Sequence, residues 1–308
     1  MTHHHSHGHS HSHTHTSQSR TRLAWALAVT LTIVLAELVG AWISGSLALA
    51  ADAGHMIVDS SGLIVALVAT QLMLKPRTDR HTWGWGRAEV IAAALQSGML
   101  IIISGIVAWQ AIRRLIVPEE LMPVPMLIIG IIGLIANVIS LAILSSDRNA
   151  SLNMRAAFLE VLNDALGSVA VIVAALVALT TGWIGADSIA SLIIAAMMAP
   201  RAYVLLRGAI QILMEQTPPE LDLAEVRHHM LELDGVEDVH DLHVSTIQTG
   251  IIALTAHLSV DERMDVSQRN RLLHELEDCT AEHFPLAINH TTFQFDSVHH
   301  QDHENLTH

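Results

Sequence analysis

The chain has 308 residues, of which 51% are hydrophobic and only 15% are charged, and its formal net charge is -14. This composition excludes an ordinary soluble domain and indicates an integral membrane protein with a soluble part attached. The acidic balance and the single lysine, Lys75, disfavour nucleic-acid binding. Cys279 is the only cysteine, which excludes an intrachain disulfide framework and fits a reducing compartment.

Residues 1–19 form a low-complexity segment in which histidines alternate mostly with Ser, Thr and Gly. Eight histidines occur in it: His3, His4, His5, His7, His9, His11, His13 and His15. The segment lacks the apolar residues of a core, so we predict disorder. A purification tag is the alternative, although a tag is usually an unbroken run of histidines. Because neutral imidazoles bind zinc and related ions, the functional interpretation is metal capture.

Six apolar segments follow within residues 20–214, and each is long enough to cross a bilayer. We place them at 23–43, 47–74, 88–116, 124–144, 152–179 and 188–213. Six spans put both termini on one side of the membrane. Most Lys and Arg residues near the span ends fall on that side, whereas Arg113 and Arg114 fall on the other. The positive-inside rule therefore predicts that both termini are cytoplasmic.

The sequence changes character after Thr217-Pro218-Pro219, and 18 of the 30 acidic residues lie from Thr217 onward. The pattern predicts a helix at 221–233 with Asp222 as its cap, strands at 236–247 and 251–260, a helix at 266–283 and a strand at 287–295. An α-β-β-α-β order indicates a small ferredoxin-like or metallochaperone-like α+β domain, placed at residues 215–298. The tail at 299–308 is predicted to be disordered.

Two of the apolar segments contain ionisable residues, which in a membrane suggest a functional site. His55 and Asp59 are four residues apart in the second span, and Glu160 and Asp164 are four apart in the fifth. Each pair shares one helix face, so two helices could offer one imidazole and three carboxylates to a divalent cation. The alternative is a set of protonated acids that are hydrogen-bonded between helices. No Lys or Arg lies near them in either segment, so a buried salt bridge is not expected.

Other polar residues of the spans give weaker signals. Asp52 shares the face of His55 and Asp59, one turn toward the outer side, where it could help the ion to leave. Glu37 and Asn137 could line the same cavity or form hydrogen bonds between helices, and for Asn137 helix packing is the favoured interpretation.

Three stretches make the resemblance to a known family specific. They are "SGSLALAADAGHMIVDSSGL" (44–63), "HTWGWGRAEVIAAAL" (81–95) and "NMRAAFLEVLNDALGSV" (153–169). Together with six spans and a small soluble domain, they resemble the cation diffusion facilitator family, the zinc-transporter type in particular. The likeness covers nearly all of the chain outside its histidine-rich ends.

The resemblance implies that the transported ion binds between the second and fifth spans, at His55, Asp59, Glu160 and Asp164. The usual zinc pattern has histidine where this chain has Glu160. A carboxylate makes the site harder and relatively favours Mn²⁺, but His55 and the histidine-rich segment keep zinc as the first expectation, with cadmium and cobalt as further alternatives. Members of the family often carry another metal site in the loop between the second and third spans, with a His-x3-His pattern. Here Trp85 stands four residues after His81, where the second histidine belongs. We therefore expect no metal site at Asp79 and His81.

The resemblance also implies a metal site in the cytoplasmic domain. His240 and His257 match the ligands on neighbouring strands, and "HTTFQFD" (290–296) resembles the family's terminal motif. His290, Asp296 and either Asp241 or His243 would complete the site. The alternative is a set of surface histidines on a solvated sheet face. Four others were assigned to the surface: His228, His229, His274 and His283.

These features together predict a metal/proton antiporter rather than an enzyme. No H-E-x-x-H zinc motif and no phosphate-binding loop occurs in the sequence. The expected activity is zinc efflux from the cytoplasm across a bacterial inner membrane, and the resemblance implies a homodimer. A passive channel or a membrane metal sensor that transports nothing remains as an alternative, and would show no proton counterflow.

Overall fold

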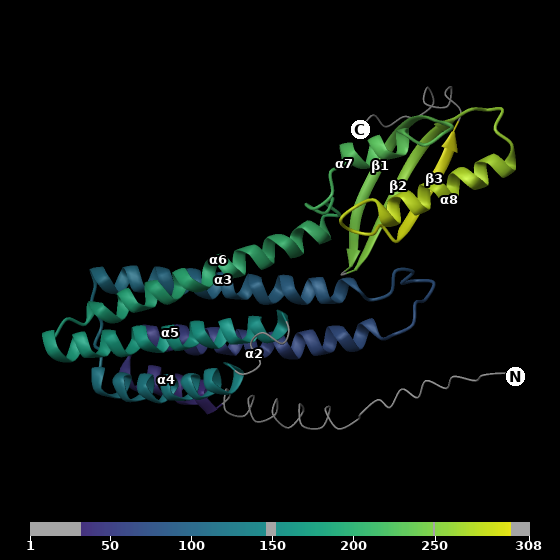
Figure 1. Ribbon diagram of the computed structural model, residues 1–308. Helices are drawn as coiled ribbons and strands as arrows, with labels where there is room; N and C mark the ends of the chain where they lie inside the picture. The colour runs from purple at the N-terminus through teal and green to yellow at the C-terminus, as the bar shows by residue number, and fades with distance from the viewer. Residues whose placement is uncertain (1–31, 146–151, 249, 297–308) are drawn as a thin grey trace, which may run out of the picture. The chain divides into compact units, whose positions relative to one another are not determined.

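The computed structural model describes residues 32–145, 152–248 and 250–296. The predictions for 1–19, for 299–308 and for the start of the first span lie outside the described residues. Within these ranges, five helices are long and apolar enough to cross a membrane: α2 Leu47–Met73, α3 Arg87–Ile116, α4 Pro123–Ser145, α5 Leu152–Thr181 and α6 Gly185–Leu213 (Figure 1). A shorter apolar helix, Thr32–Ser44, precedes them. The predicted helical membrane domain is therefore confirmed.

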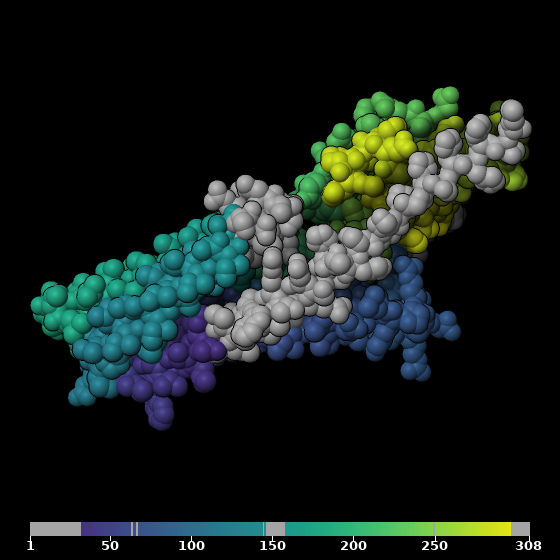
Figure 2. Space-filling view, turned by 60° about the horizontal axis from the view of Figure 1, so that its bottom comes forward, coloured from purple at the N-terminus to yellow at the C-terminus, as the bar shows by residue number. Residues whose placement is uncertain are grey.

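The described residues within 32–60 and 99–202 form the first compact unit. Its interior holds small or unbranched side chains such as Ala48, Ala175 and Met126, which allow the helices to approach closely. The helix Thr32–Ser44 lies against α4, the purple and teal segments of Figure 2: a Cβ added at Gly40 would come within 2.7 Å of Ile129. Glycine is therefore required at this contact.

A carboxylate of α6 holds the start of α2. The buried Asp187 accepts hydrogen bonds from the Leu47 backbone N–H (2.8 Å), the Ala48 N–H (3.2 Å) and the Ser46 hydroxyl (2.5 Å). The first N–H groups of a helix have no partner within it, and its N-terminus favours negative charge. Asp187 thus caps α2 from another helix, with Arg114 3.9 Å away.

The described residues within 61–98 and 203–296 form the second compact unit, which contains the α+β domain. Its elements are α7 Leu223–Leu231, β1 Val236–Gln248, β2 Ile251–Val260, α8 Val266–Glu282 and β3 His290–Asp296. The sheet has the order β1-β2-β3, with β1 antiparallel and β3 parallel to β2. Asp222 caps α7, and Asp265 forms a capping box with Gln268 at the start of α8. The α-β-β-α-β prediction is confirmed.

The two helices of this domain cover one face of the sheet. Val226 and Met230 of α7 and Leu276 of α8 share a buried cluster with Leu254 and Leu258 of β2. Because side chains alternate along a strand, His257 points to the opposite face. The sheet therefore presents one covered face and one open, histidine-bearing face.

Candidate metal transport site

The four residues expected to bind the transported ion lie together between α2 and α5. His55 Nε2 is 3.3 Å from Asp59 Oδ2 and 3.5 Å from Asp164 Oδ1, and Glu160 interacts with Asp59. The other ring nitrogen, His55 Nδ1, is buried and has no hydrogen-bond partner among the described residues. A buried polar atom that lacks a hydrogen bond is unfavourable, so the arrangement favours a further group that binds here. One imidazole and three carboxylates suit a divalent cation.

The expectation that no salt bridge neutralises these acids needs correction at Glu160. Arg201 of α6 places its Nη2 3.3 Å from Glu160 Oε2. The side chains of both residues are partly exposed, at 45% and 33%. The cation comes from a third helix, α6, whose packing the spacing of residues does not encode. Among the described side chains, the ion-pair partner of Asp164 is His55 rather than an arginine.

A second polar group lies beside this site. The carboxyl groups of Glu37 and Asp52 are almost fully buried, at 1% and 3% exposure, and contact each other. A Cβ at Gly167 would lie 3.1 Å from Asp52 Oδ1, so glycine makes room for the carboxylate. Asn137 donates a long hydrogen bond of 3.4 Å to Ser168 of α5, in agreement with its expected packing role. This group offers acidic side chains next to the four residues of the candidate site.

In the loop between α2 and α3, the side chains are engaged locally. The His81 ring stacks on Trp85 at 4.4 Å between centroids, and its backbone pairs with Thr78. Neither Asp79 nor His81 belongs to a group of three metal-ligating side chains in the described part of the chain.

In the α+β domain, three of the four expected ligands lie on the open face of the sheet. His240 of β1 is paired with His257 of β2, and these side chains and Asp296 of β3 bring ligand atoms within 4.8 Å of one another. Asp241 lies at a bulge of β1 with a φ of 47°, and its Oδ2 is 3.8 Å from His257 Nε2. The structure does not bring His290 to this group.

His290 lies at the opposite end of β3. It pairs with Ala253, and six residues separate it from Asp296, about 20 Å along a strand. Its ring contacts Trp83 at 4.7 Å between centroids. His243 forms a hydrogen bond with Asp241 (2.9 Å) and does not belong to the group of His240, His257 and Asp296.

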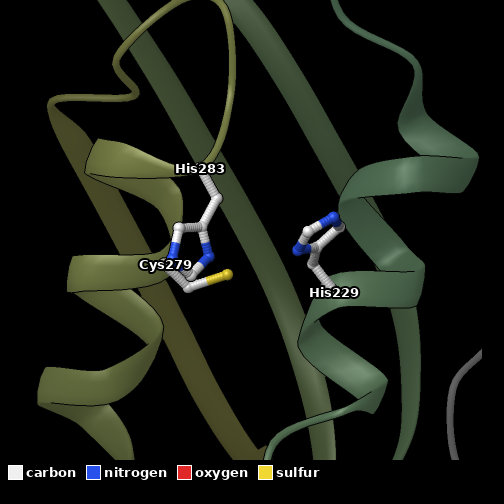
Figure 3. Close-up of side chains that lie close together, drawn as sticks. All are labelled: His229, Cys279 and His283. Carbon is white, nitrogen blue, oxygen red and sulfur yellow. The ribbon is translucent and has the colours of Figure 1, made fainter.

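A third group was not anticipated from the sequence. His229, Cys279 and His283 gather between α7 and α8 (Figure 3), although His229 and His283 were assigned to the surface. Cys279 and His283 are four residues apart, so they share one face of a helical turn. That spacing was visible in the sequence, but the approach of His229 from another helix was not.

Comparisons with known proteins agree with this architecture. The cation efflux transmembrane domain matches residues 23–214, and the cytoplasmic domain of cation efflux proteins matches residues 218–298. The chain is 36% identical to the cadmium, cobalt and zinc/H(+)-K(+) antiporter of Bacillus subtilis, over 88% of this chain and 87% of the relative. It is 37% identical to the metal cation efflux system protein CzcD of Cupriavidus metallidurans (85% and 82%) and 38% identical to the zinc transporter ZitB of Escherichia coli (85% and 83%). The chain belongs to the cation efflux family, also called the cation diffusion facilitators.

Proposed function

We propose that this divalent metal cation/proton antiporter exports Zn²⁺ from the cytoplasm and binds it at His55, Asp59, Glu160 and Asp164. The observation that carries the proposal is that His55 Nε2 lies 3.3 Å from a carboxylate of α2 and 3.5 Å from one of α5, while the buried His55 Nδ1 has no hydrogen-bond partner among the described residues. The names of the relatives, a zinc transporter and a cadmium, cobalt and zinc antiporter, support the ion class.

The mechanism follows from competition between metal and protons. An imidazole or carboxylate must be deprotonated to ligate an ion, so metal binding and proton binding exclude each other at the same atoms. Open to the cytoplasm, His55 and its three carboxylates bind the ion. Open to a more acidic exterior, they take up protons and release it, and the helices alternate between these states. The adjacent Glu37 and Asp52 supply further acidic groups for release.

Zinc is placed before manganese because of the donor set. The imidazole of His55 suits zinc, while Glu160 adds an oxygen ligand that manganese also accepts. Arg201 is already paired with that oxygen, which reduces the additional negative charge at the site.

The remaining assignments rest on the same family membership. We propose a homodimer formed through the cytoplasmic domain, because the cation efflux domain that matches residues 218–298 is named as a dimerisation domain. We also propose a regulatory ion at His240, His257 and Asp296, both termini in the cytoplasm, and a bacterial inner membrane.

The test is metal flux into liposomes under a pH gradient. Purified protein should carry Zn²⁺ against protons, Asp59→Ala should abolish the flux, and the exposed loop variant Asp79→Ala should retain it. Glu160→His should raise selectivity for Zn²⁺ over Mn²⁺. The absence of gradient-coupled flux for Zn²⁺, Cd²⁺ and Mn²⁺ would overturn the proposal and favour a membrane metal sensor.

A further inference from the structure

Three metal-ligating side chains meet on the helical side of the α+β domain, on the other side of the sheet from His240, His257 and Asp296. Cys279 and His283 lie at the end of α8, and His229 approaches from α7 (Figure 3). One atom of each side chain lies within 4.8 Å of the other two. The rings of His229 and His283 are 5.8 Å apart between centroids. The sulfur and the two rings thus enclose one small volume.

The local fold holds these side chains in place. Cys279 is only 3% exposed and belongs to the core of the domain, so its sulfur has a fixed position. His283 is the C-cap of α8, and its backbone N–H donates to the Cys279 carbonyl. The His229 ring packs edge-on against Phe284, at 5.2 Å between centroids. Packing against the core therefore holds Cys279 and His229 in position, and His283 lies beside them at the end of α8.

Neighbouring histidines of the same helices have other partners. His228 lies 3.3 Å from Glu232, and His274 lies 3.5 Å from Glu277. Within the described residues, no ion pair or hydrogen bond engages the side chains of His229, Cys279 or His283, and the His229 ring contacts the rings of His283 and Phe284. Burial and the nearby Glu232 raise the pKa of the Cys279 thiol. Without a metal, the Cys279 side chain is therefore a neutral thiol.

We propose that His229, Cys279 and His283 form a separate site for one soft divalent cation, Zn²⁺ or Cd²⁺, that links α7 to α8. One thiolate and two imidazoles are ligands that zinc accepts in tetrahedral sites, and the exposed edge at His283 leaves a fourth position for water. The thiol releases its proton to solvent when the metal–sulfur bond forms. No carboxylate belongs to the set, unlike the other two groups, so this site disfavours Mn²⁺. The proposal stands independently of which ion is transported.

The first experiment uses Co²⁺ as a spectroscopic probe in the purified full-length protein. Because Cys279 is the only cysteine, a thiolate-to-cobalt charge-transfer band can only report this residue. We expect the band to appear and to saturate at the intensity of one cobalt–thiolate bond per chain, to vanish in Cys279→Ser, and to weaken at least tenfold in His229→Gln and His283→Gln. The controls His228→Gln and His274→Gln, on the same two helices, should keep it, as should the double variant His240→Gln/His257→Gln.

A second readout does not depend on the cysteine variant being folded. Labelling of Cys279 by a small thiol reagent should be slowed at least tenfold by Zn²⁺ in the wild-type chain, and this protection should be lost in His229→Gln and His283→Gln. A wild-type protein without the charge-transfer band, or a band and protection that survive in both histidine variants, would overturn the proposal.

Discussion

Glu160 is the residue at which this chain departs from the histidine of the family pattern, and Arg201 is its counterpart. With Asp59, Glu160 and Asp164 ionised, the site carries three negative charges, one more than with histidine at position 160. Arg201, 3.3 Å from Glu160, offsets that charge. An arginine within a span is unfavourable unless it is paired, so the two residues are best explained together.

Replacement of Arg201 should therefore tighten metal binding. Arg201→Gln frees the Glu160 carboxylate and removes a repelling cation, so the KM for Zn²⁺ on the cytoplasmic side should fall by up to about fivefold, as expected for a partly exposed ion pair. The measurement is initial flux against Zn²⁺ concentration. Arg207→Gln, an exposed arginine of the same helix, is the control. In a Glu160→His background the effect of Arg201→Gln should disappear, and an equal shift there would contradict the pairing.

The contrast between the four ligands and Arg201 shows what residue patterns can predict. The four-residue spacing of His55 and Asp59, and of Glu160 and Asp164, places each pair on one helix face. That these faces meet was implied by the resemblance to the cation diffusion facilitators, because the spacing alone also allowed protonated acids hydrogen-bonded between helices. Arg201 was missed because its contact depends on how α6 packs against α5. His290 was included from the terminal motif, although the length of β3 separates it from Asp296.

At the scale of elements, the helices were predictable because long apolar runs end at charged or proline residues, such as Lys75-Pro76 and Pro118. The strands followed from alternation and from the turn at Gly250, whose φ is 80°. The cap of α2 by Asp187 was not predictable, since 140 residues separate Asp187 from Leu47. Capping rules use only residues close in the sequence, and they correctly predicted Asp222 as the N-cap of α7.

Loss of this cap should destabilise the membrane domain. Asp187→Ala leaves two buried backbone N–H groups and a hydroxyl without their acceptor, which should lower stability by about 2–3 kcal/mol. Asp187→Asn retains one oxygen and should have a smaller effect. The measurements are thermal unfolding in detergent and hydrogen exchange of the Leu47 and Ala48 amides. Glu89→Ala, an exposed acid in the first turn of α3, is the control. Unchanged exchange at Leu47 would show that Asp187 does not hold the helix.

At the scale of the whole molecule, the charges are divided between the two parts of the chain. Residues from Thr217 onward hold 18 of the 30 acidic residues and only 4 of the 16 basic ones. On the open face of the sheet, Asp241 and Asp296 lie within 3.8 Å of His257. Two such domains in a dimer repel each other, and bound cations reduce that repulsion.

Metal in the cytoplasm should therefore act on the transporter as a regulator as well as a substrate. In His240→Ala/His257→Ala, the Zn²⁺ concentration for half-maximal flux should rise several-fold and the dependence on Zn²⁺ should become less steep. The maximal rate should be unchanged, because His55 and its carboxylates are intact. The matched control is His228→Ala/His274→Ala, which removes two exposed histidines that pair with their own glutamates. Flux curves that coincide for wild type and the His240/His257 variant would contradict a regulatory ion at this face, while leaving the transport site unaffected.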